Sequence, residues 1–199
     1  VHSLVRPGGQ VTGLTNMVPG LSQKYLELMR ELLPGARQVA VVASPSNPVP
    51  EHRAALDDAA RRVSLSLRYV EVATAAEIEP ELAKVRQRGA SGIIVTQDPL
   101  TFLHRRRLTE AARAQRLPGL YWVREYVLAG GLMTYSARLP DLMRRGATYV
   151  DKLLRCARAA DLPVEQPTTF ELVINVGTAR AIGLTVPRSL LLRADEVIE

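Results

Sequence analysis

The stretch that most constrains the fold is a run of small apolar residues that stops at a cluster of turn residues. Val39 to Ala43 contains no polar side chain, and Ser44-Pro45-Ser46-Asn47-Pro48 follows directly. A helical pattern then begins near Glu51. Such an unbroken apolar run is typical of a strand buried on both faces, as in a parallel sheet.

The polar residues that follow this strand are candidates for a binding site. Ligands of open parallel sheets sit at the carboxyl ends of the strands, beside the first turns of the following helices. Ser44, Ser46 and Asn47 are therefore expected at the edge of a binding crevice. The alternative is that they only turn the chain and cap the next helix.

The same alternation of strand and helix continues through the first two thirds of the chain. Apolar periodicity predicts helices over residues 21–33, with Ser22 as N-cap, and over 51–63, 74–88 and 101–115. It predicts further strands over 67–72, 92–96 and 118–122. This order favours an α/β fold with a parallel, doubly wound sheet flanked by helices and joined by right-handed crossovers.

The pattern changes after residue 124. We expect a short helical turn over 124–128, a strand over 130–135, and a long helix from about Pro140 to Leu154. Its inward residues are predicted to be Leu142, Met143, Ala147, Val150 and Leu153. A last strand over 170–174 precedes a helix over 176–182 with Asn175 as its cap, a further helical turn over 187–192, and a tail.

Composition excludes several classes of protein and site. The net charge is +6, but the arginines are scattered along helical patterns beside Asp and Glu, which favours solvated faces over a nucleic-acid site. Cys156 is the only cysteine, so neither an internal disulfide nor a thiolate metal site is possible within this sequence. His2, His52 and His104 share no metal-ligand spacing. We therefore expect no metal and no cofactor.

Motifs of covalent catalysis and nucleotide hydrolysis are also missing from the sequence. It contains no G-x-S-x-G and no G-x-x-x-x-G-K-[ST]. The glycine-rich Arg6 to Leu14 does not follow a strand, so it does not match a dinucleotide fingerprint. No apolar run is long enough to span a membrane, and the first residues do not form a signal peptide.

Three polar segments follow predicted buried strands and should converge at one sheet edge. They are Ser44 to Asn47, Gln97-Asp98, and Tyr121-Trp122 with Arg124-Glu125. Their hydroxyl, amide, carboxylate, guanidinium and aromatic groups suit a polar or zwitterionic small ligand with a flat part. Asp98 would pair with a ligand ammonium and Arg124 with a ligand carboxylate.

Each of these residues also has a purely structural interpretation. Asp98 before Pro99 is a common turn and cap pair, and Trp122 could pack in the core. Arg124 and Glu125 could pair with other charges of the protein. The sequence alone leaves both interpretations open.

Several longer stretches together resemble one family. They are Arg6 to Leu14, Leu117 to Tyr121, Arg124 to Tyr135, Ala147 to Leu154, Asp161 to Asn175 and Leu190 to Ile198. These resemble the bacterial ABC transporter substrate-binding proteins of the tryptophan/tyrosine-type group. The resemblance covers nearly the whole chain.

The resemblance implies a type I periplasmic-binding-protein fold, in which two α/β lobes close on a ligand that is then passed to a membrane permease. It places residues 1–129 mainly in the second lobe. Residues 130–168 form a crossover, through the Gly130-Gly131 pair, and a helix of the first lobe, and residues 169–199 return to the second lobe. Family members begin with an export signal and a full first lobe, which this chain is expected to lack.

The resulting expectation is a solute-binding component of an ABC importer, not an enzyme, in the periplasm or cell envelope. Its partners would be a small-molecule ligand, an amino acid or an aromatic or carboxylated compound, and an ABC permease, but no nucleic acid. An exposed face left by the missing lobe would favour a homodimer or a domain-swapped pair. Two alternatives share the fold class: the effector domain of a transcription regulator and a small-molecule enzyme.

Overall fold

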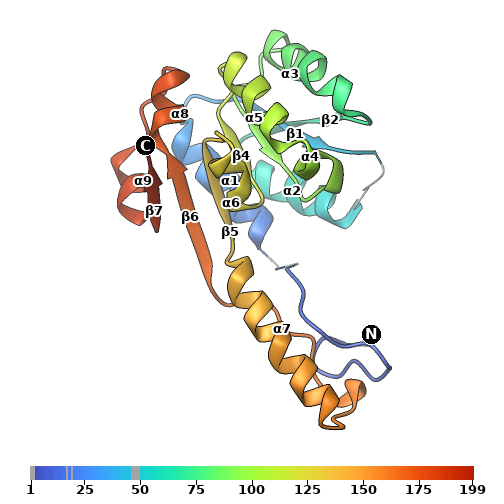
Figure 1. Ribbon diagram of the computed structural model, residues 1–199. Helices are drawn as coiled ribbons and strands as arrows, with labels where there is room; N and C mark the ends of the chain where they lie inside the picture. The colour runs from blue at the N-terminus through green and yellow to red at the C-terminus, as the bar shows by residue number, and fades with distance from the viewer. Residues whose placement is uncertain (1–2, 17, 19, 46–49) are drawn as a thin grey trace. The chain divides into compact units, whose positions relative to one another are not determined.

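The chain folds into two compact units (Figure 1). The computed structural model describes residues 3–16, 18, 20–45 and 50–199, without the side chains of residues 50–52. One unit, here called unit 1, combines residues 1–19 with 137–170, and the other, unit 2, combines 20–136 with 171–199. The chain therefore passes between the units after Ser136 and after Phe170. The sequence-based division placed boundaries at 130 and 169, and its assignment of segments to lobes stays a prediction.

Unit 2 is built on a seven-stranded sheet with the order β2-β1-β3-β4-β5-β6-β7. The strands are β1 (Gln38–Ala43), β2 (Ser66–Glu71), β3 (Ile93–Val95), β4 (Gly119–Tyr121), β5 (Met133–Ala137), β6 (Phe170–Asn175) and β7 (Glu196–Ile198). Pairings from β2 through β5 are parallel, as is that between β6 and β7. The predicted parallel α/β sheet is confirmed over these strands.

The pairing of β5 with β6 is different, because these strands carry the chain out of unit 2 and back. At one end the Arg138 amide donates to the Thr169 carbonyl at 3.4 Å, and at the other the Asn175 amide donates to the Leu132 carbonyl at 2.8 Å. The two strands are therefore antiparallel. As a result, β6 and β7 start at the same edge of the sheet where β1, β3, β4 and β5 end.

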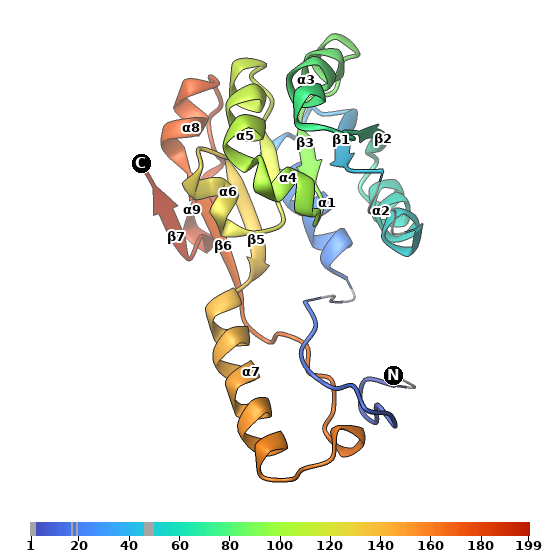
Figure 2. The same cartoon turned by 45° about the vertical axis from the view of Figure 1, so that its right-hand side comes forward.

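Helices cover both faces of this sheet, as a comparison of Figures 1 and 2 shows. On one face α1 packs against α2 and α9, and on the other α5 packs against α3 and α6. The helices of the unit are α1 (Leu21–Leu32), α2 (Pro50–Arg62), α3 (Ile78–Gln87), α4 (Pro99–Leu103), α5 (Arg105–Ala114), α6 (Arg124–Leu128), α8 (Val176–Ala181) and α9 (Arg188–Arg193), with a 3₁₀ turn η1 (Ala75–Glu77) before α3.

The side chains of the central strands point alternately to the two faces of the sheet, and both faces are buried. In β1, Val39 and Val41 belong to the core formed with α1 and α2, and Ala40 and Val42 are equally buried. Because side chains of a strand alternate between faces, this run must be apolar at every position. The apolar run noted in the sequence is therefore explained by its central place in the sheet.

Three local expectations were wrong for identifiable reasons. The N-cap of α1 is Gly20, which has φ of 84°, a left-handed conformation that glycine adopts at little cost, and Ser22 lies inside the helix. The helix predicted over 101–115 is two helices separated at His104, whose φ and ψ of −100° and 26° depart from helical geometry. The short edge strand β7 was taken as tail, because its three residues carry no alternating pattern.

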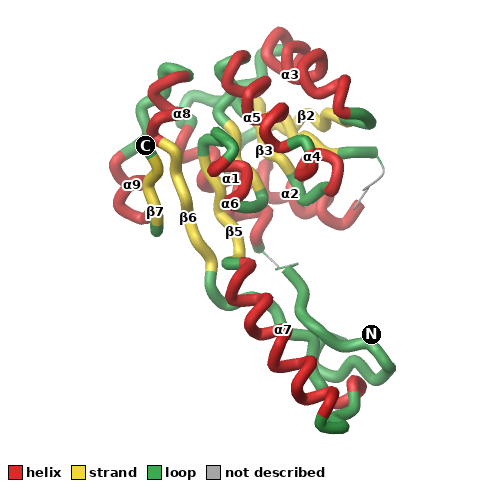
Figure 3. The backbone as a smooth tube through the Cα atoms, viewed as in Figure 1, coloured by secondary structure: helices red, strands yellow, loops and turns green. Residues whose placement is uncertain are grey.

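The described residues of unit 1 form a long helix, α7 (Leu139–Leu154), a 3₁₀ turn η2 (Ala159–Asp161) and otherwise loop (Figure 3). The N-terminal segment runs beside the connector that follows α7. Leu14 forms a parallel bridge with Glu165, and the Thr12 hydroxyl donates to the Leu162 carbonyl at 2.7 Å. The Tyr149 hydroxyl, from α7, donates to the Pro163 carbonyl at 2.6 Å. These contacts tie three separate segments together.

The predicted inward face of α7 is only partly correct. Leu142 is half-buried, but Met143, Val150 and Leu153 are 72%, 56% and 39% exposed, and Ala147 is exposed as well. Tyr149 is the buried residue of this helix instead. The helical spacing was predicted correctly, but among the described residues of unit 1 the side of α7 that packs is the one that carries Tyr149.

Candidate ligand-binding site

The structure brings the predicted site segments of unit 2 to a single edge of the sheet. β1 neighbours β3, and β3 neighbours β4, all in parallel. Ser44, Gln97-Asp98 and Trp122 follow the ends of these strands, and Arg124-Glu125 opens the next helix, α6. Ser46 and Asn47 belong to the same predicted site but lie outside the described residues.

Asp98 is occupied by the protein itself. Its side chain is completely buried, one carboxylate oxygen accepts the Thr101 amide at 2.9 Å, and the other accepts the Ser44 amide at 3.1 Å. The first bond caps α4, and the second joins the ends of β3 and β1. Asp98 therefore acts as a cap, as its structural interpretation predicts. A salt bridge from Asp98 to a ligand ammonium would compete with both hydrogen bonds. Gln97, beside it, is exposed.

Tyr121 lies in the core beneath the site. Its ring is 1% exposed and stacks on Tyr126 with centroids 4.9 Å apart and an interplanar angle of 15°. The backbone at Gly131 passes so close that a Cβ there would lie 2.7 Å from the Tyr121 ring. Gly131 is thus required for packing inside unit 2, and its neighbour Gly130 has φ of 94°, which glycine tolerates best.

Trp122 is half-buried and belongs to an aromatic group that includes a residue missed in the sequence. The Phe102 ring, from α4, lies 5.6 Å from the Trp122 ring, and Trp122 lies 6.4 Å from Tyr126. The Tyr126 hydroxyl donates to the Thr101 hydroxyl at 3.0 Å, and burial raises the pKa of Tyr126 to about 12. Phe102 looked like an ordinary helix-stripe residue, because only the fold brings α4 beside Trp122.

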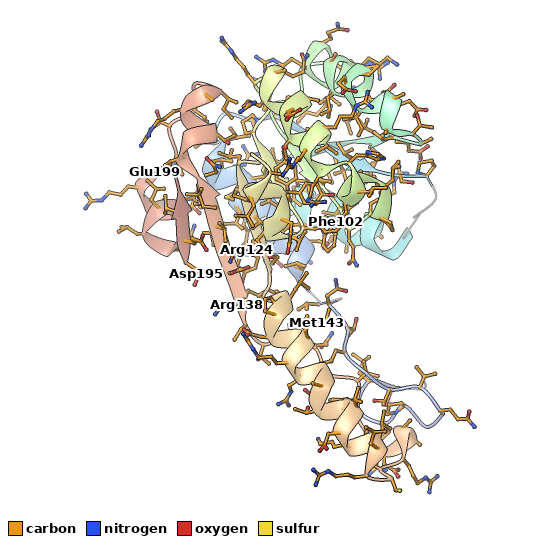
Figure 4. The ribbon with its side chains drawn as sticks, viewed as in Figure 1. Phe102, Arg124, Arg138, Met143, Asp195 and Glu199 are labelled. Carbon is orange, nitrogen blue, oxygen red and sulfur yellow. The ribbon has the colours of Figure 1, made fainter. Side chains whose placement is uncertain are left out.

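Arg124 is held between two glutamates from the returning strands. Its guanidinium donates to Glu171 on β6 at 3.2 Å and to Glu196 on β7 at 2.9 Å. The Glu171 side chain is only 7% exposed. Nearby, the Asp195 carboxylate accepts the Leu172 amide at 2.8 Å. Figure 4 shows Arg124 and Phe102 at the lower edge of unit 2, where β5 ends. Arg124 therefore links α6 to β6 and β7.

Three buried polar atoms at this edge lack a hydrogen-bond partner among the described residues. They are Trp122 Nε1, Glu125 Oε2 and Ser136 Oγ. Trp122 follows β4, Glu125 lies in α6 immediately after it, and Ser136 is near the end of the neighbouring strand β5. Buried polar groups are nearly always paired, so an unpaired group at a functional edge requires an explanation, such as a ligand or ordered water.

The described part of the chain offers no alternative centre of another kind. It contains no cluster of three or more His, Cys, Asp or Glu side chains that could hold a metal ion. Nor does any described helix have the length and apolar character needed to cross a membrane.

Comparison with known proteins identifies the family. The model of the ABC transporter substrate-binding protein family matches residues 1–198. The chain belongs to this family. No curated protein matches the sequence.

Solved structures share the fold over the whole of this chain. A conserved domain protein from Vibrio cholerae O1 biovar El Tor matches with a TM-score of 0.91 and 23% identity, over 99% of this chain and 66% of that protein. An ABC domain from Streptococcus pneumoniae, solved in complex with L-Trp, matches with a TM-score of 0.89 and 25% identity, over 100% and 66%. CD0873, a substrate-binding protein with adhesive properties from Clostridium difficile, was solved open and ligand-free. It matches with a TM-score of 0.74 and 20% identity, also over 100% and 66%.

These matches confirm the type I periplasmic-binding-protein fold expected from the sequence. The family is one of solute-binding proteins. The present chain spans 66% of the length of each of these three structures.

Proposed function

We propose that this chain is part of the solute-binding component of an ABC importer, and that its ligand binds at the carboxyl edge of the unit 2 sheet. The observation that carries the proposal is that Trp122 Nε1, Glu125 Oε2 and Ser136 Oγ, all buried and unpaired among the described residues, belong to segments at the ends of the neighbouring strands β4 and β5. The Phe102 ring lies 5.6 Å from the Trp122 ring at the same edge. Family membership supports a binding role without bond chemistry.

The proposed ligand is an amino acid or a small aromatic or carboxylated compound. Flat rings suit an apolar or aromatic body, and a few polar groups would fix its orientation. The Streptococcus pneumoniae relative, solved with L-Trp, supports this class. Phe102 and Ser136 join the proposed site. Ser44, Ser46, Asn47, Gln97, Asp98, Tyr121 and Arg124 remain candidates from the sequence, with Asp98, Tyr121 and Arg124 acting mainly as its supports.

The proposed context is that of the family. The protein would act in the periplasm or cell envelope, deliver its ligand to an ABC permease, and bind no nucleic acid. Unit 2 would correspond to the second lobe and α7 to part of the first. We also propose that the 199-residue chain forms homodimers through the exposed side of α7.

A thermal-shift screen tests the binding role. The panel contains L-amino acids, aromatic acids and nucleotides, each tested on the wild type and on Trp122→Ala. A ligand present at 100 times its dissociation constant adds about 2.7 kcal/mol of stability, a rise of about 5–11 °C for a domain of this size. We expect one chemical class to shift the wild type, and the shift to be lost in Trp122→Ala. A wild type that no compound stabilises would contradict the proposal.

A further inference from the structure

Several carboxylates lie at the ligand edge of unit 2, although the whole chain carries a net charge of +6. They belong to Asp98, Glu125, Glu171, Asp195 and Glu196. Arg105 and Arg124 are among the cations of the same edge. The Arg105 guanidinium lies over the Phe102 ring and donates to the Phe102 carbonyl at 3.1 Å.

Most of these acidic groups already have hydrogen-bond or ion-pair partners within unit 2. Asp98 accepts two backbone amides, and Asp195 accepts the Leu172 amide. Glu171 and Glu196 share Arg124. Glu125 is the exception, because its Oε2 is buried without a partner among the described residues. The Glu125 charge also raises the pKa of Arg124, but its effect is smaller than those of Glu171 and Glu196.

We propose that the Glu125 carboxylate recognises a cationic nitrogen of the bound solute. This inference rests on the proposed function, and it transfers the role predicted for Asp98 to a residue whose carboxylate is not already used. An ionised carboxylate only accepts hydrogen bonds, and burying its charge without a cation is costly. A ligand ammonium would supply both the donor and the charge.

The neighbouring groups fit the same ligand chemistry. The face of the Trp122 ring attracts a cation placed near it, as the Phe102 ring already does with Arg105. Trp122 Nε1 only donates, so it would bind an acceptor such as a ligand carboxylate oxygen, and the Ser136 hydroxyl can serve either group. A water molecule could occupy the hydrogen-bonding positions, but it would not neutralise Glu125. The charge of the bound group therefore distinguishes a ligand ammonium from a water molecule at this position.

The first test needs no ligand. Glu125→Gln keeps the size of the side chain and removes its charge. We expect the ligand-free variant to melt no lower than the wild type, because Glu125 Oε2 makes no hydrogen bond with the described residues that the substitution could remove. Glu110→Gln, at an exposed position of α5, is the matched control and should change nothing. A melting temperature that is clearly lower in Glu125→Gln than in the wild type would mean that Glu125 serves the fold, and would overturn the proposal.

The second test compares ligands with and without an amine by calorimetry. The pairs are L-tryptophan with indole-3-propionate, and L-tyrosine with 3-(4-hydroxyphenyl)propionate. We expect the wild type to bind at least one amine roughly tenfold more tightly than its deaminated partner. In Glu125→Gln the affinity for that amine should fall about 10–100-fold, the usual value of a charged hydrogen bond, with little change for the deaminated acid.

The outcomes separate this inference from the proposed function. Binding of both members of a pair with equal affinity, or an amine affinity that Glu125→Gln leaves unchanged, would overturn the role of Glu125 alone. If neither these four compounds nor any compound of the thermal-shift panel binds the wild type, the proposed function fails, and the role of Glu125 fails with it.

Discussion

At the scale of single residues, Asp98 shows how a residue suited to ligand binding can instead hold the site together. Its two carboxylate oxygens accept amides that are 54 and 3 residues away in the chain, and its side chain is fully buried. The cap could be read from Asp98-Pro99, but the bond to Ser44 could not, because it depends on β1 and β3 being neighbours.

Replacing Asp98 should therefore reduce stability before it affects specificity. Asp98→Ala removes a helix cap and the hydrogen bonds that Asp98 accepts from the Ser44 and Thr101 amides, and we expect a loss of about 2–4 kcal/mol in the free energy of unfolding. Asp98→Asn still offers one acceptor and should lose less. Urea denaturation measures both variants. If Asp98→Ala keeps its stability but loses ligand binding, the role predicted from the sequence is correct.

Arg124 is a second residue whose main partners belong to the protein. Arg124→Gln removes the ion pair between Arg124 and Glu171, whose side chain is 7% exposed. Breaking a buried pair on one side costs about 3–5 kcal/mol, but Arg124 is 29% exposed, so we expect about 1–3 kcal/mol. Glu196→Gln removes only the more exposed partner and should cost less than about 1 kcal/mol.

Denaturation of the double variant Arg124→Gln/Glu171→Gln completes the cycle for this pair. Because the variant removes both charges of the pair, it should recover part of the stability that Arg124→Gln loses. Equal losses in the single and double variants would mean that Arg124 does not interact with Glu171 in solution.

At the scale of elements, the sequence predicted the helices and strands that have a periodic apolar pattern. It did not predict features that depend on contacts between residues far apart in the chain. The apolar run of β1 and the helical stripes of α1, α3 and α5 are set by local periodicity, and all of these elements are present. The Asn175 cap of α8 was also correct, since its side chain accepts the Thr178 amide at 2.7 Å. The antiparallel pairing of β6 with β5 was not predicted, because an apolar strand has the same sequence pattern whether it runs parallel or antiparallel to its neighbour.

The candidate site was predictable in position but not in detail. Strand ends place Trp122 and Glu125 at the sheet edge by topology alone. The use of Asp98 and Arg124 within the protein required knowing which strands are neighbours, and Phe102 required the position of α4. Whether each remaining predicted residue contacts a ligand stays a prediction.

The contact between α7 and the connector of unit 1 should be sensitive to acid. Arg145 pairs with Glu165 and holds the pKa of that carboxyl below its usual value near 4.5, and burial opposes this shift only partly. A lowered pKa in the folded state means that ionised Glu165 stabilises the fold above about pH 4.5, and that this contribution disappears as the pH falls through the lowered pKa.

Melting curves of Glu165→Gln test this directly. The variant should melt below the wild type at pH 7, and the difference should shrink as the pH falls from 5 towards 3, because wild-type Glu165 becomes protonated as well. Glu110→Gln, at an exposed position of α5, controls for removing a negative charge from the chain. A difference that is constant between pH 7 and pH 3 would rule out the ionised pair as its source.

At the scale of the whole molecule, α7 carries an apolar stripe with no partner within the described chain. Met143, Ala147, Val150 and Leu154 recur at the spacing of one helix face, and all are exposed, Met143 by 72% and Leu154 by 79%. Two copies of this stripe would bury each other in an antiparallel pair. Arg144 and Asp151, seven residues apart on one flank, pair with Asp141 and Arg155 of their own chain. In the antiparallel pair they would also face the partner's Asp151 and the partner's Arg144, which is compatible with that orientation.

Self-association of the 199-residue chain through this stripe is therefore expected. Light scattering between about 1 and 100 µM should show the mass rising from monomer to dimer, and Met143→Lys/Val150→Lys should stay monomeric because it places lysines at the centre of the pair. Leu192→Lys on α9, where Leu192 is 75% exposed, is the matched control and should dimerise as the wild type does. A wild type that is monomeric at every concentration would contradict self-association, and would leave a different polypeptide as the cover of α7. Dimers that form equally well in Met143→Lys/Val150→Lys would place the interface elsewhere.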